Sequence, residues 1–131
     1  MENKGKPQMT PQILIVDDVD TNLMILENII QEMGYIPKCA SSAAQAASLI
    51  SESRPQLILL DVFMPEMDGY EATRNIRALE NAELASIPIL AMTANAFEED
   101  RQEALRCGMN GHIAKPINIE KLLETLNAIL R

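Results

Sequence analysis

Short apolar runs alternate along the chain with longer amphipathic stretches. Five runs predict strands, at 13–16, 35–39, 57–60, 87–92 and 112–114. Between and after these runs, apolar residues recur at helical spacing and predict helices at about 21–33, 42–53, 69–79, 97–107 and from 118 onward. A polar loop is expected near 81–83. Because the strand runs are apolar throughout, they predict an α/β fold, a five-stranded parallel sheet with helices on both faces.

Helix-capping residues and glycines stand at the expected helix boundaries. They are Asp20 and Asn22, which are expected to cap the first helix rather than to bind metal, together with Gly34, Ser41 or Ser42, Gly108 and Asn118. The methionines at 24, 33, 92 and 109 are expected to fill the core, and the two cysteines to be reduced residues in or near it. Residues 1–10 are expected to form a flexible N-terminal tail and 11–131 a single domain.

The net charge and the hydropathy of the chain limit the classes of partner that it is expected to bind. A net charge of −8 argues against binding to the phosphate backbone of a nucleic acid. No apolar run approaches the roughly 20 residues that span a bilayer, and the polar start of the chain does not resemble a secretory signal. We therefore expect a cytoplasmic domain that makes no membrane contact.

Polar residues follow four of the predicted strands, at the point where each strand ends. They are Asp17, Asp18, Asp61, Thr93 and Lys115. In a parallel sheet of this kind, ligands bind beyond the carboxyl ends of the strands, so these residues are expected to converge. Three carboxylates repel one another and Lys115 supplies one positive charge. The negative charge that remains would be offset by a divalent cation that binds oxygen ligands. We expect this cation to be Mg²⁺, with Mn²⁺ as the alternative.

This set of groups predicts a phosphoryl acceptor. An ionised carboxylate needs no base to activate it, so catalysis reduces to positioning and charge neutralisation. The metal would bridge the acids and the phosphoryl oxygens, while Lys115 neutralises one oxygen and the Thr93 hydroxyl donates to another.

Four motifs give the chain a family resemblance. They are Ile15-Val16-Asp17-Asp18, Leu59-Leu60-Asp61-Val62-Phe63-Met64-Pro65-Glu66-Met67-Asp68-Gly69, Ala91-Met92-Thr93-Ala94 and Ala114-Lys115-Pro116. From about Pro11 onward, the sequence resembles the receiver domain of two-component response regulators. Its motifs are most similar to those of receiver domains in hybrid sensor histidine kinases. We therefore expect either a stand-alone regulator or the receiver part of such a kinase.

The resemblance implies a flavodoxin-like (βα)5 fold with strand order 2-1-3-4-5. It also implies that Asp61 is phosphorylated by a histidine kinase or a histidine phosphotransfer protein. Asp18, Asp61 and the backbone carbonyl of Phe63 would bind Mg²⁺ directly, and Asp17 would act through a bound water. The domain would be a regulatory phosphoacceptor with self-catalysed phosphoryl transfer and autodephosphorylation, and not an enzyme in its own right.

The same resemblance implies how the phosphorylated state is read. Thr93 and Lys115 would contact the phosphoryl group, and the bond from Lys115 to Pro116 would be cis. His112 occupies the family's aromatic switch position, although it could equally be a strand residue without a switching role. Movement of Thr93 and His112 would alter the surface made by 97–107, 112–114 and the final helix, which is also the expected surface for a homodimer. Asn95 would contact attacking water or serve only in a loop.

Other functional classes remain as alternatives. A receiver fold could act as a docking module without phosphorylation. A phosphohydrolase with an aspartyl nucleophile is a remoter alternative, because it would need a second acid two residues after Asp61, where Phe63 stands. A flavin-binding flavodoxin would need a phosphate loop after the first strand, and Asp17-Asp18-Val19-Asp20 has the wrong charge for it.

Phe63 generates a prediction about the lifetime of the phosphorylated state. Its ring is bulkier than the polar residues often found two positions after the acceptor, so it is expected to shield the acyl phosphate from water. The Phe63→Asn variant should therefore lose its phosphoryl group faster than the wild type, as measured by following phosphoprotein decay. An equal or longer lifetime in the variant would refute this role.

Overall fold

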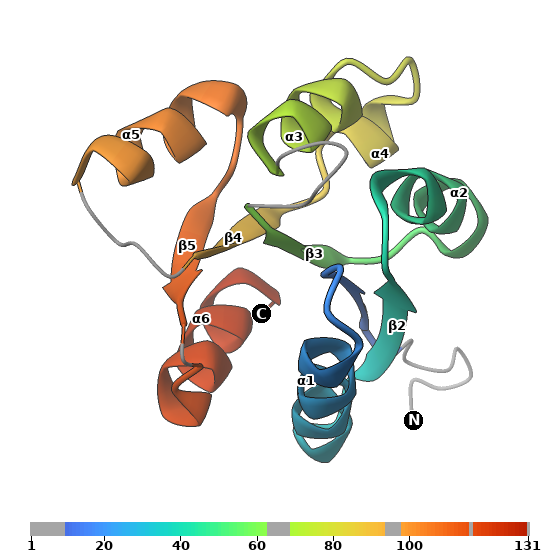
Figure 1. The fold of residues 1–131 in the computed structure, drawn as a ribbon. Helices are drawn as coiled ribbons and strands as arrows, with labels where there is room; N and C mark the ends of the chain where they lie inside the picture. The colour runs from blue at the N-terminus through green and yellow to red at the C-terminus, as the bar shows by residue number, and fades with distance from the viewer. Residues whose placement is uncertain (1–9, 63–68, 94–97, 116, 131) are drawn as a thin grey trace.

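The chain forms one parallel sheet of five strands (Figure 1). The structure is a computed structural model and describes residues 10–62, 69–93, 98–115 and 117–130. The strands are β1 (Gln12–Val16), β2 (Ile36–Ala40), β3 (Leu57–Asp61), β4 (Ile89–Thr93) and β5 (Gly111–Ala114). Their order is β2-β1-β3-β4-β5, with every neighbouring pair parallel, which confirms the predicted flavodoxin-like topology.

Helices cover both faces of the sheet. They are α1 (Asp20–Glu32), α2 (Ala43–Ser53), α3 (Gly69–Arg77), α4 (Ala82–Ala85), α5 (Glu98–Cys107) and α6 (Ile119–Leu130). In Figure 1, α1 and α6 lie on one face, and α2, α3 and α5 lie on the other. Within the described residues, no helix is both long enough and apolar enough to span a membrane.

The core consists of two apolar layers separated by the sheet. Ile13 and Leu57 pack with α1 and α6, whereas Leu14 and Ile58 pack with α2, α3 and α5. Successive strand residues point to opposite faces, and here both faces are buried. This double burial is the physical reason that the strands read as continuous apolar runs.

Most of the predicted helix ends are confirmed. The Ser42 hydroxyl accepts from the Gln45 amide at 3.2 Å, and Asn118 Oδ1 accepts from the Lys121 amide at 3.0 Å. Gly34 and Gly108 take φ angles of +93° and +108°, a region that favours glycine after a helix.

Three local predictions were wrong. The loop expected near 81–83 contains the short helix α4, because Asn81 Oδ1 accepts from the amides of Glu83 and Leu84 at 2.9 and 3.2 Å. Val19, and neither Asp20 nor Asn22, occupies the N-cap position of α1. Met24 is 60% exposed and lies outside the core, although Met92 and Met109 are buried within it. Residues 1–9 of the predicted tail lie outside the described part of the chain.

Both cysteines are free thiols, as predicted. Cys107 is buried between α5 and the sheet, and Cys39 is half-buried in β2. Burial raises the pKa of each thiol above its ordinary value, so both are protonated at neutral pH.

Arg77 forms hydrogen bonds with the two segments that precede β4 and β5. Its Nη1 donates to the carbonyl oxygens of Ala85 and Ile87 at 2.7 and 2.8 Å. Its Nε donates to the Gly108 carbonyl at 2.9 Å, and Nη2 donates to Asn110 Oδ1 at 2.9 Å. The guanidinium remains charged, although burial lowers its pKa. One planar cation therefore fixes the amino ends of two strands.

Replacing Arg77 should destabilise the whole domain. The Arg77→Met variant removes the donors to three backbone carbonyls and one amide oxygen, and should lose about 3 kcal/mol of unfolding free energy. Arg74→Met, in the same helix, is the matched control, because the Arg74 side chain is 52% exposed and its ion pair with Glu103, at 3.9 Å, lies on the surface. The control should lose no more than about 0.5 kcal/mol in the same urea titration. Equal losses in the two variants would contradict the role assigned to Arg77.

Candidate functional site

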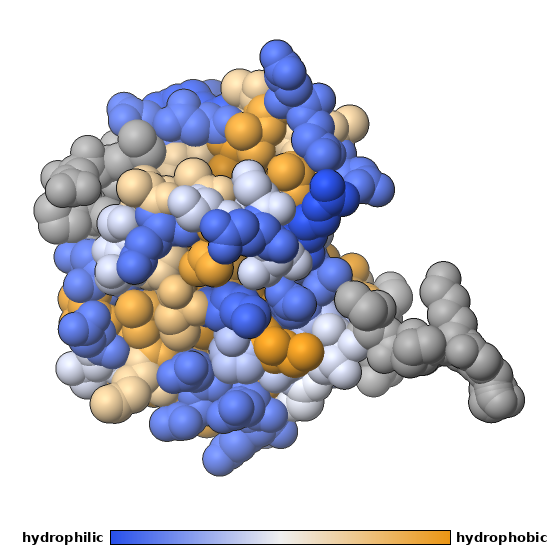
Figure 2. Space-filling model, turned by 90° about the vertical axis from the view of Figure 1, so that its right-hand side faces the viewer, coloured by the Kyte–Doolittle hydropathy of each residue, from blue (hydrophilic) through white to orange (hydrophobic). Residues whose placement is uncertain are grey.

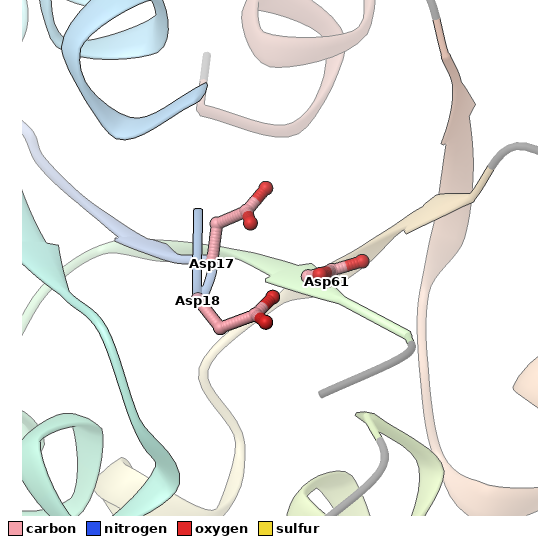
Figure 3. A group of neighbouring side chains, drawn as sticks. All are labelled: Asp17, Asp18 and Asp61. Atoms are coloured by element: carbon pink, nitrogen blue, oxygen red, sulfur yellow. The ribbon is translucent and has the colours of Figure 1, made fainter. Parts of the chain in front are cut away.

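The carboxyl ends of β1 and β3 bring three acids together. Val16 of β1 pairs with Leu60 of β3, so the residues that follow, Asp17 and Asp61, leave neighbouring strands at the same level. Carboxylate oxygens of Asp17, Asp18 and Asp61 lie within 4.8 Å of one another. Figure 3 shows the three side chains gathered at this end of the sheet. The predicted convergence of the acids is therefore confirmed.

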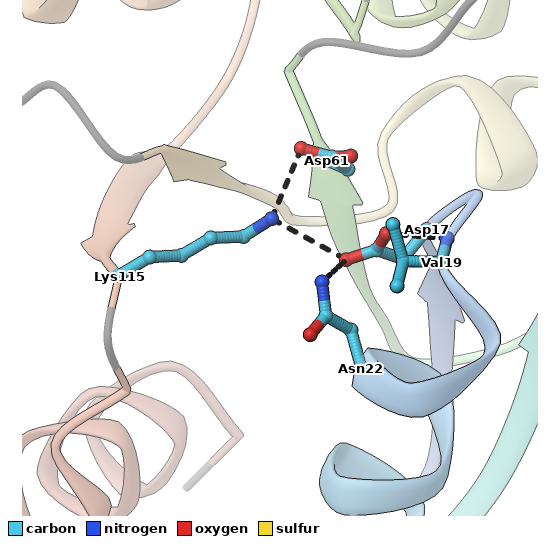
Figure 4. Close-up of polar contacts among 5 residues, drawn as sticks. All are labelled: Asp17, Val19, Asn22, Asp61 and Lys115. Carbon is cyan, nitrogen blue, oxygen red and sulfur yellow. Dashed lines mark hydrogen bonds and ion pairs between the residues drawn. The ribbon is translucent and has the colours of Figure 1, made fainter.

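Asp17 is the most enclosed of the three acids, with 0% of its surface exposed. Its Oδ1 accepts from the Val19 amide at 3.0 Å. Its Oδ2 accepts from Asn22 Nδ2 at 3.3 Å and from Lys115 Nζ at 3.4 Å (Figure 4). A buried charge needs such partners, and Asp17 has two donors from the start of α1 and one from the segment after β5.

Lys115 bridges the two buried acids. Its Nζ lies 3.4 Å from Asp17 Oδ2 and 3.3 Å from Asp61 Oδ1, and Figure 4 shows it reaching across from β5. The Lys115 amide donates to the Thr93 carbonyl at 2.9 Å, which fixes the start of this side chain against the end of β4. The lysine was predicted to offset one acidic charge, and its position is consistent with that.

The charge balance of the site leaves room for a cation. Among the described residues, three carboxylates face one ammonium group, so these four groups together carry a net charge of −2 when all are ionised. Asp61 is 6% exposed while Asp18 is exposed, so the cluster opens to solvent on the side of Asp18. Carboxylate oxygens in such a cluster are the ligands that Mg²⁺ prefers, and the residues present fit a hard divalent ion.

Thr93 and His112 lie on the adjacent strands β4 and β5. Thr93 ends β4 and is 6% exposed, and His112 is half-buried in β5. Ala91 pairs with His112 and Thr93 pairs with Ala114, so alternation places His112 and Thr93 on the same face of the sheet. Phe63, Asn95 and Pro116 lie outside the described residues, and their roles stay predictions.

Two residues near the acids were missed in the sequence. Asn22 was predicted as a helix cap, but it contacts Asp17, and its place in the first turn of α1, directly after the acids that follow β1, is the signal that could have revealed this contact. Gly69 starts α3 against the backbone of Asp61, and its amide donates to the Val62 carbonyl at 2.6 Å. A Cβ at Gly69 would lie 2.7 Å from the Asp61 carbonyl oxygen, so only glycine fits there.

A five-stranded parallel sheet in this order, with helices on both faces, places the chain in the class of flavodoxin-like domains, and its acidic cluster and lysine lie at the edge where such sheets carry their ligand sites. Within that class, the chain belongs to the response regulator receiver domain family, which residues 13–127 match.

Three known proteins illustrate the family. The polar-differentiation response regulator DivK of Brucella ovis is 33% identical over 122 residues, which cover 93% of this chain and 98% of DivK. Probable histidine kinase 4 of Oryza sativa subsp. japonica is 35% identical over 137 residues, 90% of this chain but only 14% of that protein. The receiver domain of a Pseudomonas aeruginosa sensor histidine kinase is 36% identical, with a TM-score of 0.82 over 93% of this chain and 98% of that one. In that structure a magnesium ion is coordinated in the active site cleft.

Membership of this family confirms the predicted class of function. The chain is a receiver domain of two-component signalling, a regulatory phosphoacceptor domain and not a dedicated enzyme. Receiver domains interact with histidine kinases or phosphotransfer proteins and bind Mg²⁺ at an acidic pocket, and this chain has such an acidic cluster.

Gly69 generates a prediction about the site. In the Gly69→Ala variant the new methyl group would meet two backbone groups, the Asp61 carbonyl and Val62 Cα at 2.7 and 2.8 Å, so the end of β3 must shift. We expect a loss of about 2 kcal/mol in unfolding free energy and weaker binding of Mn²⁺ by titration calorimetry. Gly111→Ala is the control, since its nearest contact is the end of the Leu90 side chain at 3.2 Å. Metal binding weakened equally in both variants would contradict a specific role for Gly69.

Proposed function

We propose that Asp61 accepts a phosphoryl group from a phosphohistidine in a reaction that depends on Mg²⁺. The observation that carries this proposal is the Lys115 ammonium group, which lies between Asp17 and Asp61 inside the acidic cluster. A cation there offsets part of the negative charge that the neighbouring carboxylates place around the acceptor.

The proposed transfer is a direct displacement. A carboxylate oxygen of Asp61 attacks phosphorus, a P–O bond forms, and the P–N bond to the donor imidazole breaks with its electron pair leaving on nitrogen. No proton has to be removed from Asp61, so positioning and charge neutralisation supply the catalysis. Lys115 already contacts Asp61 Oδ1 at 3.3 Å and is placed to neutralise an oxygen of the incoming group. Thr93, at the end of the adjacent strand, would donate a hydrogen bond from its hydroxyl group to another phosphoryl oxygen.

The metal would be held mainly by Asp18 and Asp61, with the Phe63 carbonyl as a third ligand and Asp17 acting through water. Exposure supports this division, because Asp18 is open to solvent whereas all three donors to Asp17 occupy its oxygens. When bound, Mg²⁺ would neutralise phosphoryl oxygens during transfer. Mn²⁺, with similar ligand preferences, is the expected substitute.

The output surface of the proposed switch consists of α5, β5 and α6. Thr93 and His112 lie on the same face of the sheet, so a movement of Thr93 toward the phosphoryl group would leave space for His112. Leu105 on α5 and Ile119 on α6 are 60% and 54% exposed, which supports a partner or a second copy of the chain on this surface. The cytoplasmic location expected from the sequence stays a prediction.

Labelling with a small phosphodonor tests the proposal. Wild type and Asp61→Asn are incubated with acetyl phosphate, with Mg²⁺ or with chelator, and their intact masses are measured. Wild type should gain the mass of one phosphoryl group only when Mg²⁺ is present, and Asp61→Asn should gain none, because its amide is not a nucleophile. A known receiver domain serves as the positive control. Absence of the adduct in wild type while the control is labelled would favour a docking module that works without phosphorylation.

A further inference from the structure

Asp17 Oδ2 accepts hydrogen bonds from two side chains that approach it from different elements. Asn22 Nδ2 donates from the first turn of α1 at 3.3 Å, and Lys115 Nζ donates from the segment after β5 at 3.4 Å (Figure 4). The Asp17 side chain is wholly buried, so bulk water cannot take the place of either donor. The Asn22 amide and the Lys115 ammonium group therefore share one oxygen.

The ammonium group of Lys115 lies at nearly equal distances from the two buried acids. Its distances of 3.4 Å to Asp17 and 3.3 Å to Asp61 are nearly equal, and both exceed the roughly 2.7–2.9 Å of a fully formed bond between an ammonium and a carboxylate. A cation in this position moves toward whichever carboxylate carries the more concentrated negative charge. A neutral donor on one of the two acids therefore changes where the lysine lies.

We infer that Asn22 is a positioning residue for the phosphoryl transfer proposed above, on which this inference rests. By donating to Asp17 Oδ2, the Asn22 amide disperses the charge of that carboxylate and weakens its attraction for cations. Lys115 then stays within reach of Asp61, and Asp17 competes less for a divalent ion than the exposed Asp18 does.

The chemistry of Asn22 suits this role better than that of other residues of similar size. An aspartate at this position would add a fourth acid to the cluster and would offer no proton to Asp17. A leucine would fill nearly the same volume but, within the part of the chain that the structure describes, would leave Asp17 Oδ2 with Lys115 as its remaining side-chain donor. Removing the amide should therefore draw Lys115 toward Asp17 and away from the acceptor.

The two consequences of removing the amide have opposite signs. With less dispersed charge on Asp17, the acidic cluster of the Asn22→Leu variant should bind Mn²⁺ about threefold to fivefold more tightly, as expected for one net hydrogen bond. With Lys115 displaced from Asp61, the rate constant for labelling by acetyl phosphate at saturating metal should fall about fivefold. A residue that served only to hold the fold together would weaken metal binding and transfer alike.

The experiment compares Asn22→Leu with Asn28→Leu, the same substitution at an exposed position of α1. The Mn²⁺ dissociation constant is measured on the unphosphorylated protein from the electron paramagnetic resonance signal of the free ion, and labelling rates are measured by intact mass. Asn28→Leu should match the wild type in both measurements. Asn22→Gln, which keeps an amide donor, should lie closer to the wild type than Asn22→Leu does.

Several results would overturn the inference. They are unchanged metal affinity in Asn22→Leu, weaker affinity together with slower transfer, and an Asn22→Gln variant that behaves like Asn22→Leu. The metal measurement also separates this inference from the proposed function. If wild type accepted no phosphoryl group, the proposed function would fail, yet tighter Mn²⁺ binding in Asn22→Leu would still show that the amide weakens the attraction of Asp17 for cations.

Discussion

Like charges crowded at one end of the sheet are the constraint on which the site depends. Asp17 and Asp61 are almost fully buried within reach of Asp18, an arrangement that would be unfavourable without cations and donors close by. The strand order meets this need, because β1 lies beside β3 while β4 and β5 follow on the other side. Lys115 can therefore reach both buried acids from the far edge. The acidic charge that Lys115 does not offset is the physical basis for the proposed binding of a divalent ion.

Much of this architecture follows from the sequence because it rests on rules that act over short stretches. Strands buried on both faces leave apolar runs without alternation, and parallel strands bring their carboxyl ends to one edge. These two rules alone predict that Asp17, Asp18, Asp61, Thr93 and Lys115 lie together. The structure brings the three acids and Lys115 together and ends β4, the strand beside β3, at Thr93. The helix ends at Ser42 and Asn118 likewise depend only on a local side-chain bond.

What the sequence did not reveal depends on the path of the chain through space. Asparagine is a common helix-capping residue, but the position of Asn22 in the first turn of α1 directs its side-chain amide to Asp17. Gly69 is needed because another backbone passes within van der Waals contact, which no local pattern encodes. Met24 breaks the expected pattern because it lies on the outward side of α1. The space-filling view in Figure 2 shows hydrophobic atoms scattered among hydrophilic ones at the surface, so an apolar side chain alone does not mark the interior.

The end of the sheet opposite the acids is organised by Arg77, and its partners there have a consequence for variation among related sequences. Three of its four acceptors are main-chain carbonyls, at Ala85, Ile87 and Gly108. A carbonyl is supplied by any amino acid, so this cation constrains the route of the backbone and leaves side-chain identity at Ala85 and Ile87 to other forces. In the α3–β4 connection, the exposed positions are therefore places where substitutions can accumulate, as long as the carbonyls still arrive at the guanidinium group, whereas Leu84 and Ile87 are buried and are constrained by packing.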